Sequence, residues 1–235
     1  MLPCFRPVVI VCTVACAAPV AACDLALALA VDVSGSVDSD EYRIQMDGLA
    51  AALRDPIVSE ALVRAQAALL LVQWTGSTRQ QITIPWTRIS GFVALDVFAA
   101  SVAEDPRMWR NYSTAVGEAL TYTAAAFDAV PDCTRHLIDL SGDGVSNEGI
   151  APADVLGDLR AVGITVNAIA IEQGEPDLAA YFYENVIVGE GAFVVSANSF
   201  QDYPARIRKK LLREVTRQTA WSSQDQFSAH PERFR

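Results

Sequence analysis

The chain has 235 residues, which is enough for one large domain or two small ones. Hydrophobic residues make up 51% of it, a share that supports a well-buried core and argues against a wholly disordered chain. The net charge of -10 argues against nucleic-acid binding through a basic face.

Residues 1–22 have the composition of an export signal. Arg6 supplies a small positive region, and Val8–Ala18 is an apolar run that is too short to span a bilayer comfortably. Small residues at 20–22 then precede a cleavage point at Cys23. The segment holds one arginine and no acidic residue, so its removal changes the net charge from -10 to -11. We predict an exported protein, periplasmic or secreted.

Cys23 and Cys133 are the two cysteines that remain after this cleavage. Two cysteines in an exported protein suggest one disulfide. Residues 20–23 also resemble a bacterial lipobox, in which the cysteine carries lipid, and this lipid-anchored alternative stays open. Against it, the first predicted strand begins at Leu25 and leaves almost no tether between a lipid and the fold.

The first half of the chain alternates apolar strands with amphipathic helices. Leu25–Ala30 predicts a buried strand, and Ser39 can cap the following helix. The apolar face of that helix repeats at i, i+4, i+7 and i+11, at Tyr42, Met46, Leu49 and Leu53. Residues 67–74 predict a second strand. Residues 80–86 alternate and contain Pro85, which is typical of a sheet edge.

The second half continues the alternation. Helices are predicted at 90–103, 114–130, 152–161, 177–186 and 207–215, and strands at 135–140, 164–171 and 192–196. This order predicts an α/β fold with a doubly wound, mostly parallel, Rossmann-like sheet that helices cover on both faces. One domain over residues 24–215 accounts for it. Residues 216–235 are polar and are expected to form a loosely ordered tail.

Polar side chains alternate with apolar residues directly after the first predicted strand, in the stretch VDVSGSVD, residues 31–38. In an open parallel sheet, ligands bind at the carboxyl ends of the strands. Asp32, Ser34 and Ser36 offer one carboxylate and two hydroxyls there. Oxygen ligands suit hard cations, Mg²⁺ before Ca²⁺, and do not suit zinc. Gly35 would let the loop turn tightly, so that the two serines converge.

Two further places can complete this set of ligands. Asp143, in the sequence SGDG, also follows a buried strand and so belongs to the same edge of the sheet. Thr114 lies at the start of a predicted helix, from which a hydroxyl can project toward that edge. Ordinary loop and turn roles for these residues are the alternative.

The three elements together resemble the von Willebrand factor type A domain. Its metal-ion-dependent adhesion site consists of DxSxS after the first strand, a Thr in TxxGxAL (here residues 114–120) and an Asp-Gly after a later strand. The resemblance spans about residues 25–215, and the closer likeness is to a bacterial group of exported type A proteins of unknown function. The family fold adds one antiparallel edge strand to the sheet.

The resemblance implies a role for each ligand. Ser34 and Ser36 would bind the metal directly, Asp32 and Asp143 would act largely through bound water, and Thr114 would bind directly or through water. Many relatives have a Thr before the last Asp where this chain has Gly142, but that position is not a ligand. The expected cofactor is Mg²⁺, with Mn²⁺ or Ca²⁺ as alternatives, and its open position would take a Glu or Asp from a protein partner.

The resemblance also bears on the cysteines. In the family's sheet the first and fourth strands are parallel neighbours. Cys23 precedes Asp32 by nine residues and Cys133 precedes Asp143 by ten, so both cysteines would lie at the end of the sheet opposite the metal. A disulfide between them is therefore expected.

Two other functions compete with a binding module. A hydrolase would place its serine in GxSxG beside a histidine. Here the serine lies in VSGSV, and the only histidines are His136, at the wrong end of a strand, and His230, in the tail. A metal-dependent phosphatase usually needs a cation over the phosphate, and no lysine precedes Lys209. We expect no enzyme activity. The third reading is a structural envelope protein whose metal only stabilises the fold.

Several charged or aromatic residues have two interpretations. Residues 109–112, WRNY, should flank the metal, where Trp109 either anchors a partner or packs in the core. Asp139 either supports the site or is a buried or solvent-facing group, and Glu148 either rims the site or is a solvated loop residue. The basic residues 206–213 of the last helix form a solvated face or dock on an anionic membrane.

Overall fold

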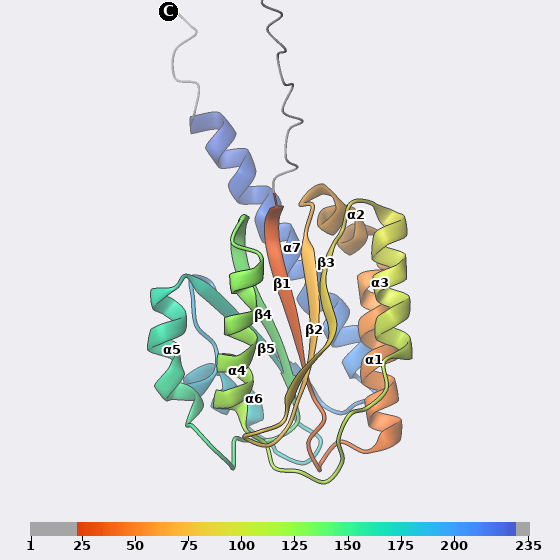
Figure 1. Cartoon of the computed structure of the whole chain (residues 1–235), viewed down its shortest axis with the longest axis vertical. Coiled ribbons are helices and arrows are strands. Elements are labelled where there is room, and N and C mark those ends of the chain that lie inside the picture. The colour runs from red at the N-terminus through yellow and green to blue at the C-terminus, as the bar shows by residue number, and fades with distance from the viewer. Residues whose placement is uncertain (1–22, 229–235) are drawn as a thin grey trace, which may run out of the picture.

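The structure, a computed structural model, describes the backbone of residues 23–228 and the side chains of residues 23–216 (Figure 1). The predicted export signal, residues 1–22, lies outside the described residues. The described strands are β1 (Cys23–Asp32), β2 (Ala68–Trp74), β3 (Gln80–Arg88), β4 (Cys133–Gly142), β5 (Ile164–Ile171) and β6 (Val194–Ala197). The helices are α1 (Ser39–Leu53), α2 (Pro56–Arg64), α3 (Phe92–Glu104), α4 (Val116–Ala125), the 3-10 turn Ala126–Ala129, α5 (Pro152–Ala161), α6 (Leu178–Asn185) and α7 (Tyr203–Ser228).

The strands form one sheet in the order β3-β2-β1-β4-β5-β6. Every neighbouring pair is parallel except β2 and β3, so β3 is the antiparallel edge strand. This confirms the predicted doubly wound α/β fold, which is von Willebrand factor A-like. The strand order reverses between β1 and β4, and this is the place where an open α/β sheet binds ligands.

Both faces of the sheet are covered, which explains the uninterrupted apolar sequence of β1. Leu25, Leu27 and Leu29 belong to a core that includes residues of α1, α2, α3 and α7. The alternating alanines, Ala26, Ala28 and Ala30, belong to a second core with residues of α4 and α6. In Figure 1 the two groups of helices flank the sheet, and the loops after β1 and β4 gather at its lower end.

A disulfide joins β1 to β4 at the opposite end of the sheet. Cys23 and Cys133 are direct partners in the parallel register, with Cα atoms 4.4 Å apart and sulfur atoms bonded at 2.02 Å. The pairing expected from the sequence is therefore present. It also removes the lipid-anchored alternative, because a thiol used in a disulfide cannot carry a lipid.

The helix starts differ in detail from the predictions. Asp38, and not Ser39, caps α1, and it forms a capping box with Glu41. The sequence analysis missed α2, although Asp55 accepts hydrogen bonds from two backbone N–H groups of its first turn and Pro56 occupies the first helical position. Residues 114 and 115, expected in a helix, precede α4 and are not helical.

The last helix also departs from the predictions. It runs to Ser228, so residues 216–228 of the predicted loose tail are helical. Lys210 is not part of a solvated basic face, because it is fully buried and pairs with Asp139 at 2.5 Å and with Glu214 at 2.8 Å. Asp139 is accordingly a buried, paired group of β4.

Candidate metal centre

The predicted ligands meet at the carboxyl ends of β1 and β4. Asp32 ends β1, and Asp143 follows Gly142 at the end of β4. Asp32 and Ser34 are fully buried, and Thr114 and Asp143 are nearly so, with 5% and 7% exposure. Ser36 is the exposed member of the set.

The loop after β1 is shaped by its own side chains and by the segment opposite. The Ser34 N–H donates to Oδ1 of Asp32 at 2.7 Å, a local bond typical of aspartate in turns. The Gly35 N–H donates to the Tyr112 carbonyl at 2.8 Å. A Cβ on Gly35 would lie 3.2 Å from both the Asn111 Cα and that carbonyl oxygen. Glycine at position 35 thus permits a close approach of the two backbone segments, and its backbone does not adopt the positive φ that a tight glycine turn implies.

Thr114 is held in place by the loop that follows Asp143. Its N–H donates to Oδ1 of Asn147 at 2.9 Å, and its carbonyl accepts from the Asn147 N–H at 2.9 Å. Ser146 Oγ accepts from the Val116 N–H at 3.2 Å and so satisfies the start of α4. The sequence analysis did not select Asn147 or Ser146. Their closeness to Asp143 in the chain, and their ability to cap a helix, were the available signals.

Hydrogen bonds join the two strand ends. The hydroxyls of Ser34 and Ser36 lie 3.1 Å apart, and Ser36 Oγ donates to Oδ1 of Asp143 at 2.7 Å. Ser36, Thr114 and Asp143 line one hollow of about 450 Å³. The structure therefore brings all five predicted residues to the same edge of the sheet.

Burial of two carboxyl groups shapes the electrostatics. Burial, with the nearby charge of Asp143 adding to it, raises the pKa of Asp32 to about 8, and the hydrogen bonds from Ser34 only partly oppose the shift. Burial raises the pKa of Asp143 as well; the Ser36 hydrogen bond opposes this rise and the charge of Glu41 adds to it. A positive charge placed between the two carboxyl groups would favour their ionised forms.

The donor chemistry fits a hard divalent cation. Oδ2 of Asp32 is buried and has no hydrogen-bond partner among the described residues, so one carboxylate oxygen is available to a ligand. No group of three or more His, Cys, Asp or Glu side chains with metal-binding geometry occurs among the described side chains, those of residues 23–216. The set here is of another kind, two carboxylates and three hydroxyls, which is oxygen chemistry of the type that Mg²⁺ prefers.

Two polar residues that are not candidate ligands, and that the sequence analysis missed, donate hydrogen bonds to the backbone of β1 and the loop after it. Nη2 of Arg107 donates to the carbonyls of Val33 at 3.2 Å and Ser34 at 2.9 Å. Nε2 of the buried Gln45 donates to the Asp32 carbonyl at 3.2 Å. Neither contact has a signal in the sequence, since each joins segments that are distant in the chain.

Of the residues expected beside the candidate ligands, some lie in the core and others on the surface. Trp109 is partly buried and packs against the core, whereas Tyr112 is 41% exposed and lies under the Arg79 guanidinium, 3.8 Å from ring centroid to Cζ. Glu148 is an exposed loop residue that accepts a hydrogen bond from Ser77 at 2.7 Å. His136 lies in β4 against Phe127, away from the ligands, while His230 lies outside the described residues.

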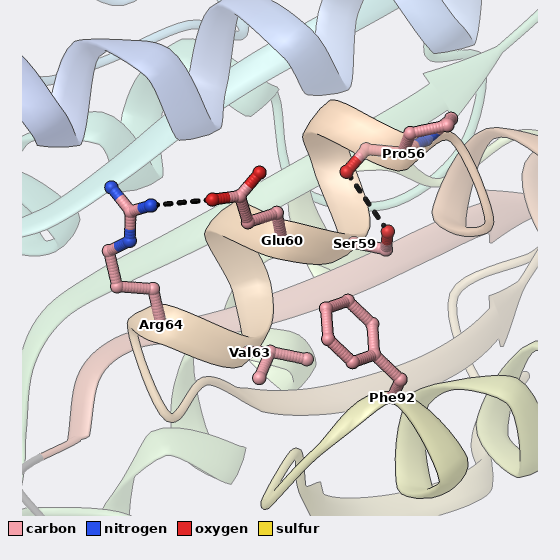
Figure 2. Close-up of a pocket in the computed structure, with 6 residues that line it drawn as sticks. All are labelled: Pro56, Ser59, Glu60, Val63, Arg64 and Phe92. Atoms are coloured by element: carbon pink, nitrogen blue, oxygen red, sulfur yellow. Dashed lines mark hydrogen bonds and ion pairs between the residues drawn. The ribbon is translucent and has the colours of Figure 1, made fainter.

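A second hollow, of about 510 Å³, is formed by α2 and the first residue of α3 (Figure 2). Phe92 and Val63 give it an apolar side, and the ion pair between Glu60 and Arg64 lies at its rim. None of the candidate ligands lines it, so it is separate from the metal centre.

Comparison with known protein families gives one match over most of the chain. The family described as "Protein of unknown function (DUF1194)" matches residues 22–219. The chain belongs to this family. The match covers the whole sheet and all five candidate ligands of the DUF1194 chain. No curated protein matches it.

Solved structures show the same fold at low sequence identity. Proximal thread matrix protein 1 from the mussel byssus superposes with a TM-score of 0.63 at 18% identity, over 81% of this chain and 47% of that chain. A von Willebrand factor type A protein from Catenulispora acidiphila gives 0.57 at 16%, over 82% and 42%. The pilus adhesin SpaC from Lactobacillus rhamnosus GG gives 0.58 at 12%, over 81% and 31%. The chain spans less than half the length of each.

Within residues 23–228, no helix combines the length and the apolar character that a bilayer crossing requires.

Proposed function

We propose that this protein is an exported binding module that captures an acidic side chain of a protein partner through a bound Mg²⁺. Asp32, Ser34, Ser36, Thr114 and Asp143 would hold the ion. The proposal rests on the chain of hydrogen bonds that joins Asp32, Ser34, Ser36 and Asp143 at the strand ends, beside a fully buried Oδ2 of Asp32 that has no partner among the described residues. A buried carboxylate oxygen that lacks a partner costs free energy, and a divalent cation bound to it would offset that cost.

The charges of the ligands determine what the centre can do. Asp32 and Asp143 together balance the charge of one divalent cation, and the three hydroxyls add no charge. The bound ion supplies a Lewis-acidic position for a carboxylate, because Mg²⁺ takes six oxygen ligands and rarely receives all of them from one protein. Ser36 is exposed and Thr114 lines the hollow, so the open side of the centre would face a partner.

The comparisons support this reading. One structure of the mussel protein is described as having a zinc-occupied MIDAS motif; it is 20% identical, with a TM-score of 0.63, over 81% of this chain and 48% of that chain. The neighbours are described as a thread matrix protein and a pilus adhesin. We favour Mg²⁺ over zinc because every candidate donor in this chain is oxygen. The disulfide supports an exported location, because disulfides persist in oxidising compartments.

Calorimetric titration of the mature protein with Mg²⁺ and Mn²⁺, beside Asp32→Ala, tests the proposal. We expect about one ion per chain, with binding lost in the variant. No binding at millimolar metal would remove the mechanism and leave the fold unaffected. A metal that only stabilises the fold would instead show itself as a large loss of melting temperature in chelator without an effect on partner capture.

A further inference from the structure

The wall of the candidate metal centre carries two acidic side chains that are not candidate ligands. Glu41, from the first turn of α1, and Glu175, from the loop after β5, line the same hollow as Ser36, Thr114 and Asp143. The other lining residues are uncharged: Gly144, Val145, Asn147, Gln173, Gly174 and Phe200. Among the residues that the structure describes, no lysine or arginine lines the hollow.

The local structure fixes Glu41 on this wall. Oε2 of Glu41 accepts the Asp38 N–H at 2.8 Å within the capping box, and Oε1 accepts from Nε2 of Gln173 at 2.7 Å. Both oxygens are therefore positioned by neutral donors, which leave the negative charge of Glu41 in place. Glu175 is exposed. Neither side chain forms an ion pair with any residue that the structure describes.

The negative charge of this wall determines which carboxylate ligands can approach the metal. Asp32 and Asp143 already balance a divalent cation. Arg107, which holds the β1 loop beside the centre and acts on Asp143, offsets only one of the two further carboxylates, so Glu41 and Glu175 leave the loaded hollow with a negative charge. A ligand with only a carboxylate would meet repulsion from the wall as it reached the metal. A ligand that also brings a cation would place that cation against the wall and exchange repulsion for attraction.

We infer that the partner segment carries a lysine or arginine next to its metal-binding Asp or Glu, and that this cation contacts Glu41 and Glu175. The inference rests on the proposed function, because the metal-bound carboxylate places the neighbouring cation against the wall. It specifies the partner's chemistry: a mixed acidic–basic motif rather than an acidic one.

Three capped synthetic peptides test the inference. They share a central Asp in a glycine background and differ only in the following residue, which is Lys, Gln or Glu. Each is titrated into the mature protein by NMR in millimolar Mg²⁺ at low ionic strength, and again with chelator. The wall is removed in a Glu41→Gln/Glu175→Gln variant, in which Gln at position 41 can still complete the capping box. Glu184→Gln, which changes an exposed residue near the end of α6 outside the hollow, controls for the loss of a negative charge elsewhere on the surface.

We expect the Lys peptide to bind roughly fivefold or more tightly than the Gln peptide, and the Glu peptide to bind most weakly. This order should collapse in the double variant, persist in Glu184→Gln and shrink in high salt. Equal Mg²⁺-dependent binding of all three peptides would overturn the inference and leave the proposed function standing. So would a Lys preference that survives in the double variant. No Mg²⁺-dependent binding of any peptide would overturn both.

Discussion

Asp32 is a residue whose environment conflicts with its charge. It is fully buried, its Oδ2 has no partner among the described residues, and the second buried carboxyl group, Asp143, lies close enough to raise its pKa. In the metal-free protein this arrangement destabilises the fold. A cation bound at the end of β1 would account for this carboxyl group, because a positive charge beside it replaces repulsion from Asp143 with attraction to the cation.

The substitution Asp32→Asn should separate the destabilising effect of the buried carboxyl group from its role in cation binding. The raised pKa means that the carboxyl favours folding below its ordinary value of 3.8 and that this contribution is lost as the pH rises through about 8. In chelator at pH 8, the variant should therefore unfold at a higher temperature than the wild type, by ~2–4 °C for each kcal/mol gained. It should show no Mg²⁺-induced shift. Scanning calorimetry measures both, with the exposed Asp158→Asn as control; a variant that still responds to Mg²⁺ would contradict the assignment.

The pH dependence of metal affinity follows from the same pKa values. Metal binding requires ionised carboxylates, so below the Asp32 pKa of about 8 each binding event must release a proton. The Mg²⁺ dissociation constant should rise about tenfold for each pH unit below that value. Calorimetry in two buffers of different ionisation enthalpy counts the protons. A dissociation constant that is flat from pH 8 down to about pH 6 would show that Asp32 is not a ligand.

At the scale of elements, α4 and the loop after β4 are fitted to one another through Gly117. A Cβ at this position would lie 2.3 Å from the carbonyl oxygen of Ile150. The helix can therefore approach the loop this closely only if residue 117 is glycine. That loop also carries Asn147, which binds the backbone of Thr114. The glycine of TxxGxAL thus links the packing of α4 to the geometry of the metal centre.

Gly117→Ala should destabilise the protein by about 1–3 kcal/mol and weaken Mg²⁺ binding, because the displaced loop no longer positions Thr114. Gly157→Ala is the matched control. That glycine lies in α5 with nothing within 4 Å of the added methyl, so alanine should stabilise by about 0.5–1 kcal/mol and leave metal affinity unchanged. Denaturant unfolding and metal titration of both variants test this pair. Equal effects of the two would contradict it.

Helix α7 is bound to the sheet by a buried ionic cluster. Lys210 contacts Asp139 of β4 and Glu214, and Asn167 of β5 donates to Glu214 at 2.9 Å. Burial, with Asp139 adding to it, raises the pKa of Glu214 to about 7. One lysine therefore holds two buried carboxyl groups in the core, and its removal would leave both without a cation.

Lys210→Met should cost about 3–5 kcal/mol, since an unpaired buried charge is strongly unfavourable. The triple variant Lys210→Met/Asp139→Asn/Glu214→Gln removes the charges together and should recover most of that loss. Urea unfolding of wild type, single and triple variants measures the three values. A single variant as stable as the wild type would show that the cluster contributes nothing to the attachment of α7.

For the whole molecule, the disulfide and the metal centre lie at opposite ends of the same strand pair. Cys23–Cys133 closes a chain segment with a sequence separation of 110 residues. In the entropic account such a crosslink stabilises the fold by about 5 kcal/mol. Replacing both cysteines with alanine should lower stability by that order and leave Mg²⁺ affinity unchanged. Parallel unfolding and calorimetric titrations of the variant check this, and a metal affinity that fell with the disulfide would show that the two ends are coupled.

Sequence alone determined the features that depend on local patterns and on chain order. The apolar run of β1, the alternation of strands with helices, and the three polar elements at Asp32–Ser36, Thr114 and Asp143 all follow from residue type and spacing. Parallel strands bring their carboxyl ends to one edge, so the meeting of these elements needed no knowledge of side-chain packing. The cysteine pairing likewise followed from strand adjacency once the family resemblance supplied that adjacency.

The tertiary structure decided what depends on contacts between distant segments. Lys210 belongs to a basic sequence run, yet it is buried because that side of α7 faces Asp139 on β4. Arg107 holds the site through the carbonyls of Val33 and Ser34, a contact that no sequence pattern marks. Glu41 lies in the first turn of α1, and only the tertiary structure brings it into the same hollow as Asp143. Local propensity and spacing report on neighbours along the chain, whereas burial and charge pairing are set by neighbours in space.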